Sequence, residues 1–581
     1  MTIVQQGAIN TTAQLVPDLL VQIVPPSNYL LNGVPTNVLG IVGTGTWGPV
    51  NSPTDASGVT DGTQLFGRPQ VRKYDLMTAV AAAALQGANA FKLVRVTDGT
   101  DTAASGNLAQ GGVGSATVAA GGSGYSVGNQ INLAGGAVLT VATVSSGAVT
   151  GVTVTTPGSY GTPPANPVPQ SSTSGSGTGA TFNLTFPTGL TLNAKYTGTT
   201  GNALVATLNV GSAANSYKLT VSLPGLLPEV YDNITGSGNA LYQAIAAAVN
   251  LGANTLRGKS EIVTASAGAA TGAPAPSTIA FSGGTDGATT ITSATLVGQD
   301  IIPRKGMYAL RATGASVAML ADADDSTQWT LQQAFGLSEG IYMIATSPAG
   351  DTISNFAATI ASAGIDGYSA KVMFGDWVYI NDNVNGVTRL ISPQGFEAGK
   401  LAALSPEQSS LNKPLNGIVA TQKTFANQKY SGAELQALAL ARADLITNPA
   451  PGGSYFAARF GRNSSSNAVI HGDNYTRMTN YIASTLNAGM GIYIGQLQSD
   501  TTRQRAKATI DNFLQAMYEQ GMIEDWQVIL DKSNNPPNRV ALGYMQADVK
   551  VRYLSIIEYF ICNLESGQSV QITRSNAQPA A

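Results

Sequence analysis

The chain has 581 residues, which is enough for about three or four domains of ~150 residues each. Charged residues make up only 11% of the sequence and the net charge is −3, so the basic surface that neutralises nucleic-acid phosphates is not expected. No run of about 18 apolar residues occurs, and the N-terminus has neither the basic start nor the apolar centre of a secretory signal. We therefore expect no nucleic-acid partner, no membrane insertion and no Sec signal.

Two residue types that often carry chemistry occur once each. Cys562 cannot form a disulfide within the chain or a cysteine-based metal site, and its position in a predicted C-terminal strand favours a buried small side chain. His471 would need a nucleophile and an orienting carboxylate to act as a base, and Asp473 is its sole nearby partner. No GxSxG, HExxH, P-loop or CxxC motif is present. We expect no catalytic residue, no cofactor, no metal and no enzyme activity.

The N-terminal region contains a short apolar segment enclosed by prolines, Pro17 on one side and Pro25 and Pro26 on the other. Its apolar residues are Leu19, Leu20, Val21, Ile23 and Val24. An extended segment isolated by prolines has no local partner, so it is expected to pair elsewhere. The alternative is an ordinary edge strand of its own domain.

A buried strand at 38–42 is followed by Gly43, Gly45 and Gly48, which match the GxGxxG spacing of dinucleotide-binding loops. Pro49 and a loop follow these glycines where that motif needs a helix, and no acidic residue lies about 20 residues further on, so cofactor binding is not predicted. An alanine-rich helix at 74–86 and a strand at 91–96 complete this part.

Residues 102–194 contain no charged residue and no histidine. Short strands with glycine and asparagine turns can be solvated through hydroxyls and backbone, whereas a surface helix needs charge. The region is therefore predicted to be a small β module, with strands at 131–133, 138–144 and 149–155. Its expected role is an outward decoration, with glycan or receptor binding as the alternative.

Between residues 289 and 404 apolar strands alternate with helices, which is typical of parallel βαβ units in an open α/β sheet. Strands are predicted at 317–321, 341–346 and 371–380, and helices at 329–337 and 351–362. Asp322, Asp324 and Asp325 follow the first of these strands. We expect these aspartates to lie in a solvated loop, and a divalent cation site is the alternative.

The C-terminal region has a one-faced helix at 501–520, with Asp500 as the expected N-cap and Gly521 just past its end. A run rich in β-branched and aromatic residues from 549 to 561 predicts a terminal strand. Arg503, Arg505 and Lys507 lie in the first helical turns, where the helix dipole disfavours cations by about 0.3 to 1 kcal/mol each.

Several segments, taken in order, resemble the contractile tail sheath family of phage tails, R-type bacteriocins and type VI secretion sheaths. The matching residues are Gly43, Gly48, Pro49, Val50 and Asn51; Tyr196, Gly198, Gly201 and Asn202; Gly283, Gly284, Asp286 and Gly287; and Glu519, Gln520 and Gly521. A further segment keeps Pro393, Gly395, Ala398 and Gly399 but departs from the family at Phe396 and Glu397. The resemblance covers residues 15–100 and 194–575.

The resemblance implies an α/β multidomain protein, with an inner α/β domain built from both chain ends, an open, mostly parallel α/β middle domain and an all-β insertion. The expected divisions are an N-terminal linking arm (1–28), the N-terminal part of the sheath core (29–101), the outward-facing uncharged insertion (102–193), a β-rich sheath domain (194–288), the α/β middle domain (289–425) and a C-terminal inner domain with a tube-facing helix and a terminal linking strand (426–581).

The resemblance also implies a mechanical function, in which subunits polymerise around the tail tube and contract to drive it through the host envelope. Strands exchanged between subunits would be formed by Leu19, Leu20, Val21, Ile23, Val24, Val549, Val551, Tyr553, Ile556 and Ile561, and the tube would be contacted by Arg503, Arg505 and Lys507. The implied partners are further copies in stacked hexameric rings, the tail tube protein, and baseplate and tail terminator proteins. The protein would be made in the host cytoplasm and reside in the contractile tail of a virion.

Two other classes remain open. A phage or cell-surface host-binding protein would use the β module as its active part and the α/β region as a platform. A hydrolase on the α/β domain is disfavoured, because no set of acid, base and nucleophile is found in the sequence.

Overall fold

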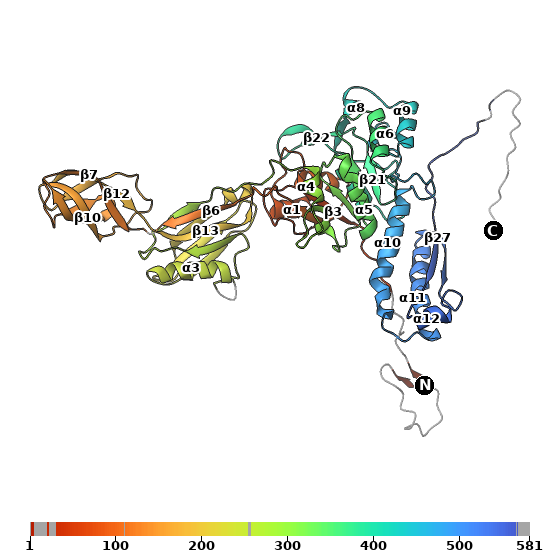
Figure 1. Ribbon diagram of the computed structural model, residues 1–581, viewed down its shortest axis with the longest axis horizontal. Helices are drawn as coiled ribbons and strands as arrows, with labels where there is room; N and C mark the ends of the chain where they lie inside the picture. Colours follow the sequence, from red (N-terminus) through yellow and green to blue (C-terminus); the bar gives the residue numbers. More distant parts are fainter. Residues whose placement is uncertain are drawn as a thin grey trace, which may run out of the picture.

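The computed structural model describes residues 2–4, 20–22, 31–109, 111–253, 257–564 and 566. Figure 1 shows an elongated molecule, with a β module at one end and a helical unit carrying both chain ends at the other. Two further regions lie between them, a second β region and an α/β domain.

The α/β domain is built on a six-stranded sheet with the strand order β21-β20-β19-β3-β5-β4. Five strands are parallel and the edge strand β4 is antiparallel, so an open, mostly parallel sheet is present as predicted. The strands are β3 (Val38–Gly43), β4 (Thr54–Ala56), β5 (Ala90–Arg95), β19 (Val317–Leu320), β20 (Tyr342–Thr346) and β21 (Ala370–Met373).

The strands from the N-terminal part of the core, β3, β4 and β5, therefore lie in one sheet with the strands of the middle region. The reason is the register of β3, in which Leu39 pairs with Val317 of β19 and with Phe91 of β5. Only the stretch before β3 reaches the C-terminal helices, where the Val34 backbone N–H donates to Thr485 Oγ1 at 3.2 Å.

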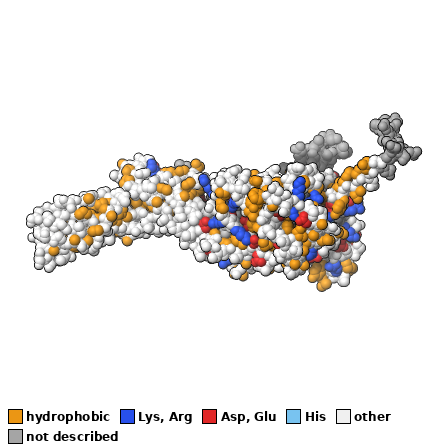
Figure 2. Space-filling view, turned by 90° about the horizontal axis from the view of Figure 1, so that it is seen from above, with side chains coloured by type: hydrophobic (Ala, Val, Ile, Leu, Met, Phe, Trp, Pro, Cys, Tyr) orange, Lys and Arg blue, Asp and Glu red, His pale blue; other side chains and the backbone are white. Residues whose placement is uncertain are grey.

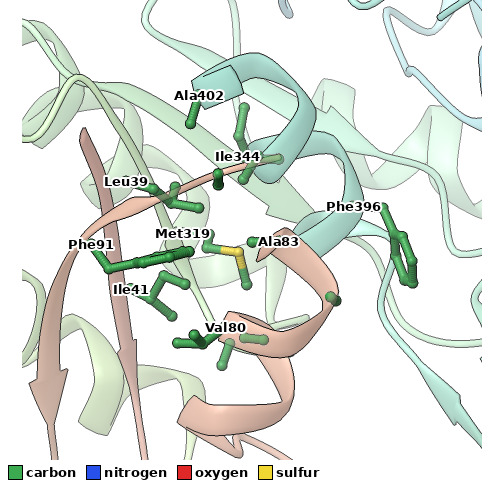
Figure 3. Packing of buried hydrophobic residues seen from close by; sticks show 14 of the residues in the cluster. Leu39, Ile41, Val80, Ala83, Phe91, Met319, Ile344, Phe396 and Ala402 are labelled. Atoms are coloured by element: carbon green, nitrogen blue, oxygen red, sulfur yellow. The ribbon is translucent and has the colours of Figure 1, made fainter. Parts of the chain in front are cut away.

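Both faces of this sheet are buried, because alternate strand residues point to opposite sides and both sets are apolar. On one side Leu39 and Ile41 pack against α2 (Leu76–Ala84) and α7 (Gln394–Ala403) (Figure 3). The two helices approach so closely that a Cβ on Gly399 would lie 2.4 Å from Ala83 Cα. The opposite face is covered by α4 (Ser293–Val297), the short helix η4 (Gly306–Leu310) and α5 (Trp329–Glu339).

One predicted strand of this domain divides into two. Residues 371–380 form β21 and then β22 (Val378–Asp382), which joins β23 (Val387–Ile391) and β24 (Ile418–Thr421) in a separate three-stranded sheet. The chain turns where Gly375 passes Pro348, with no room for a side chain, since a Cβ there would lie 2.0 Å from the Pro348 carbonyl oxygen. Beyond the sheet lie α6 (Ile353–Ser362), α8 (Gln422–Phe425), α9 (Gly432–Leu440), β25 (Ile446–Thr447) and β26 (Ala457–Ala458).

The second β region consists of two antiparallel sheets that share one hydrophobic core with helix α3 (Asn239–Leu251). One sheet contains β6 (Ala103–Ala109), β13 (Thr188–Thr197) and β17 (Val263–Ala267). The other contains β14 (Val205–Val210), β15 (Tyr217–Ser222), β16 (Glu229–Ile234) and β18 (Ser277–Ala280).

The β module, residues 113–187, has a six-stranded sheet and a hydrophobic core of its own. It is shorter than the predicted insertion, because the two ends of the uncharged region form β6 and β13 of the second β region. Figure 2 shows no blue or red side chain at this end of the molecule. Its strands are β7 (Ser115–Ser123), β8 (Gln130–Leu133), β9 (Val138–Ser145), β10 (Ala148–Thr156), β11 (Val168–Thr173) and β12 (Thr178–Thr185).

The C-terminal unit consists of α10 (Asp473–Gly489), α11 (Asp500–Glu519) and a two-stranded antiparallel sheet of β27 (Ile523–Ile529) and β28 (Asp548–Tyr553), with α12 (Pro537–Ala541) between the strands. The N-cap of α11 is Ser499, whose side chain accepts from Thr502 N at 3.1 Å, and not Asp500 as predicted. The predicted terminal strand ends early, at Tyr553. None of the helices in the described ranges is both long and apolar enough to cross a bilayer.

The β module can be tested as an independent insertion, because Thr188 pairs with Ala109 across the β6–β13 hairpin. Replacing residues 110–187 by Asn-Gly, a dipeptide that favours a tight hairpin turn, should leave the rest of the chain folded. We expect an unchanged thermal unfolding midpoint for the remaining domains, measured by calorimetry, together with loss of the signal of the β module. Insoluble or unfolded protein would show that the module is part of the main core.

Candidate functional site

The N-terminal segment has a local partner, contrary to the expectation that it has none. Leu20 and Val21 lie in β2 (Leu20–Gln22), whose backbone pairs in parallel with β1 (Thr2–Val4) of the same chain. Leu19, Ile23 and Val24 lie outside the described residues. Within the described ranges this sheet has only two strands, so each keeps one open edge.

The predicted C-terminal strand separates into a packed part and an exposed part. Val549, Val551 and Tyr553 lie in β28, which pairs with β27, and they pack against the core between α10 and α11. Ile556 and Ile561 lie beyond the end of the strand, and Ile561 is 82% exposed. Cys562 is exposed as well, so the prediction of a buried cysteine is wrong.

Residues 554–564 expose a run of large apolar side chains that a soluble monomer rarely leaves in water. Six of them have exposed fractions between 41% and 88%: Leu554, Ile557, Tyr559, Phe560, Ile561 and Leu564. The adjoining sheet of β27 and β28 has only two strands in the part of the chain described, so it offers two open edges. Unpaired backbone groups at such edges are templates for added strands.

The three cations predicted to contact a tube do not form one patch. Arg503 is buried and makes an ion pair with Asp500. Arg505 is exposed and Lys507 is half-buried. Positions two apart on a helix face different sides, which separates Arg505 from the other two. Of the predicted set, only Arg505 and Lys507 present substantial surface to a partner.

His471 and Asp473 do not form a catalytic pair. His471 Nε2 lies 3.7 Å from Glu558 Oε1, whereas the Asp473 carboxylate accepts hydrogen bonds from the hydroxyls of Tyr342 and Ser410, each at 2.7 Å. Burial, and then the positive charge of Arg462, lower the pKa of His471 below its usual value.

The three aspartates after β19 have separate structural roles. Asp322 is buried and accepts from Ser392 N at 3.1 Å, Asp324 pairs with Lys73 at 2.8 Å, and Asp325 accepts from Thr327 N at 3.0 Å. Asp322 is therefore not part of a solvated loop as predicted. In the described ranges no three metal-type side chains are grouped so that they could hold an ion.

A buried ion cluster, which we define as Lys371, Glu397, Asp444 and Asp473, was not predicted from the sequence. Lys371 Nζ in β21 lies 2.5 Å from Glu397 Oε1, 2.8 Å from Asp444 Oδ2 and 3.1 Å from Asp473 Oδ1, and all four side chains are fully buried. These residues come from a strand, two helices and a loop, and the first and last of them are 102 positions apart, so no local pattern could have indicated the cluster. The one signal was the departure of Glu397 from the family pattern.

Backbone and hydroxyl groups complete the cluster. Asp444 accepts from Phe460 N at 3.0 Å and Gly461 N at 2.9 Å, while Glu397 Oε2 has no hydrogen-bond partner. Burial disfavours the charge on Lys371, but the three carboxylates outweigh it and raise its pKa.

The pKa values of Glu397 and Asp473 are shifted in opposite directions. Burial raises the pKa of Glu397 to about 7, since the Lys371 charge offsets this only in part and the other two carboxylates add to it. For Asp473 the burial effect is outweighed by Lys371 and by the Tyr342 and Ser410 hydroxyls, which lower the pKa. Glu397 is therefore the group that takes up the proton near neutrality.

The cluster joins the C-terminal unit to the α/β domain. Asp473 is the first residue of α10, whereas Lys371 and Glu397 belong to β21 and α7. One turn further along α10, the buried Arg477 guanidinium donates to the carbonyl oxygens of Leu404 at 2.7 Å and Ser405 at 2.8 Å. A buried ion pair is strongly destabilising when one partner is lost, so these contacts hold α10 in one position.

The raised pKa of Glu397 predicts a pH dependence of stability. A carboxyl whose pKa rises on folding contributes stability that is full below its unfolded value of 4.5 and is lost as the pH rises through about 7. Glu397→Gln removes this contribution, so its stability relative to wild type should increase between pH 5 and pH 8 by about 2 to 3 kcal/mol. Chemical denaturation of both proteins at pH 5 and pH 8 measures the change. The exposed Glu519→Gln is the control, and parallel pH profiles for wild type and Glu397→Gln would contradict the prediction.

The sequence matches no protein-family model and no curated protein. Two solved structures match nearly the whole chain. The sheath tail protein of Desulfitobacterium hafniense is 14% identical, with a TM-score of 0.50 over 88% of this chain and 93% of that one. The sheath tail protein of Listeria innocua is 11% identical, with a TM-score of 0.53 over 90% of this chain and 96% of that one. The resemblance seen in the sequence motifs is thus confirmed in three dimensions, and the chain has the fold of the sheath tail proteins.

Proposed function

We propose that this protein is the structural subunit of a contractile tail sheath, which polymerises around a tail tube and contracts to drive the tube through a host envelope. The observation that carries the proposal is the fold match to two sheath tail proteins over 88% and 90% of the chain. The role is mechanical and not enzymatic. The partners are further copies in helically stacked hexameric rings, the tube protein, and baseplate and terminator proteins, within the contractile tail of a phage or a phage-like particle.

The chain ends support strand exchange between copies. The two-stranded sheet of β27 and β28 leaves two edges open, and the exposed apolar residues 554–564 follow directly from it. An added strand gains backbone hydrogen bonds at such an edge and buries its apolar side chains. In the proposed assembly residues 19–24 and 560–564 of one copy extend the sheets of neighbouring copies.

The β module favours a second candidate function, host binding, on one observation. It has its own core and lies at the end of the molecule opposite the C-terminal unit of α10, α11 and β27 (Figure 1). In a sheath built through the chain ends, this end would face outwards. The exchange of residues 110–187 for Asn-Gly separates the two functions, since it should abolish host binding and leave assembly intact.

Trimming the chain ends tests the assembly. Deleting residues 1–26 or 555–581 should give folded monomers that build no cylinders, because each deletion removes an exchanged segment and spares β28. Deletion must not extend into β28, since Val549, Val551 and Tyr553 pack in the core of the C-terminal unit. Sedimentation and negative-stain microscopy measure assembly, and circular dichroism checks the fold. Normal cylinders from either truncated chain would refute strand exchange by that end.

The tube contact is tested at the two accessible cations. Arg505→Glu with Lys507→Glu should weaken co-sedimentation with preformed tubes by about tenfold, since like charges would then face an acidic tube surface. Arg503 is left unchanged because its ion pair with Asp500 stabilises the start of α11. Lys259→Glu, at an exposed site in the second β region, is the matched control. Unchanged binding of the double variant would remove these residues from the interface.

A further inference from the structure

The C-terminal segment carries a single charge where it crosses the body of the protein. Glu558 is the only Asp, Glu, Lys, Arg or His residue among residues 554–564. Its carboxylate makes an ion pair with the Arg462 guanidinium, whose Nε also donates to Oε1 at 3.4 Å, and His471 Nε2 lies 3.7 Å from the same oxygen. Three-quarters or more of each of these side chains is removed from water.

The neighbouring contacts make this a docking site and not a lone surface pair. Arg462 Nη2 also donates to the Tyr559 hydroxyl at 3.4 Å, and Asn474 Nδ2 donates to the Leu554 carbonyl oxygen at 3.1 Å. The segment also forms one wall of a cavity of about 440 Å³, which His471 and Asn474 line from the body of the protein. A bidentate arginine–carboxylate contact on a partly buried surface is stronger than an exposed ion pair.

The loop that carries Arg462 and His471 is held rigidly by its own hydrogen bonds. Asn463 donates from Nδ2 to the Ile470 carbonyl oxygen at 2.7 Å and to Thr476 Oγ1 at 2.9 Å, and from its backbone N–H to the His471 carbonyl oxygen at 2.7 Å. On the inner side, Gly461 N donates to Asp444 of the buried ion cluster. The docking site therefore has a fixed position relative to the α/β domain.

We propose that Arg462 and His471 form an intramolecular docking site for Glu558, which fixes residues 554–559 to the body and sets the direction in which the chain leaves it. The free part of the C-terminal segment then begins after Tyr559 and not at the end of β28. Six fixed residues shorten the reach of the segment by roughly 20 Å. The proposal deepens the proposed function, because this segment is the one expected to join another copy, but docking itself is a property of the single chain.

Hydrogen exchange and a label test the docking in the full-length unassembled protein. Glu558→Gln and Arg462→Gln should each speed amide exchange in residues 554–559 by roughly threefold to tenfold. They should also lower the fluorescence anisotropy of a maleimide dye on Cys562, which is exposed and is the only cysteine in the sequence. The double variant with Glu558→Arg and Arg462→Glu should restore both signals, because it rebuilds the ion pair with reversed charges.

Arg552→Gln is the matched control, since it removes an arginine–glutamate pair of 3.1 Å on the exposed face of β28 next to the segment. It should change neither signal. Wild-type exchange in both Glu558→Gln and Arg462→Gln would overturn the proposal, and so would equal effects of Arg552→Gln. Cylinder formation is measured separately, so a chain that docks normally but never assembles would refute the proposed function and leave the docking site standing.

Discussion

The charge of Lys371 is enclosed by three carboxylates in the interior of the protein, and the placement of the C-terminal unit depends on that contact. Burying a lysine among carboxylates is costly, so their attraction must be realised in one geometry or the interior is strongly destabilised. That geometry requires β21, α7 and the first turn of α10 to meet. The loop that contacts Glu558 is fixed to this cluster, because Gly461 N donates a hydrogen bond to Asp444. One buried cation thus orients the helices, the β27–β28 sheet and the root of the C-terminal segment.

Many helices and strands were predictable because they depend on patterns of apolar and turn residues within short stretches of sequence. The strand at 38–42, the helix at 329–337 and three of the six strands of the β module were predicted within a few residues, since apolar period and turn residues are properties of short windows. The expected order of the domains came from the sheath motifs, because a short window of sequence contains no information about it. The parallel sheet followed from the alternation of strands and helices, although the sequence did not indicate that β3 would lie beside β19.

The parts that the sequence did not predict depend on contacts between distant residues. Glu397, Asp444 and Asp473 are ordinary acids in their own neighbourhoods, and only folding brings them to Lys371. Arg503 was placed with Arg505 and Lys507 because they are close in sequence, yet helical geometry turns it inward to Asp500. The predicted strand at 371–380 is interrupted because Gly375 passes close to Pro348. The residues of the strand themselves do not indicate this contact. Cys562 was expected in a paired strand, but the strand ends nine residues before it.

The β module has 75 consecutive residues, 113–187, and none of them is Asp, Glu, Lys, Arg or His. Its surface potential is therefore set by hydroxyl and amide dipoles alone, and neither acidification nor added salt can alter its formal charge. Adhesion or repulsion at that tip would rest on shape, hydroxyl hydrogen bonds and apolar contact. In the proposed sheath, an outward-facing β module would present the same uncharged surface over a wide range of pH and salt concentration.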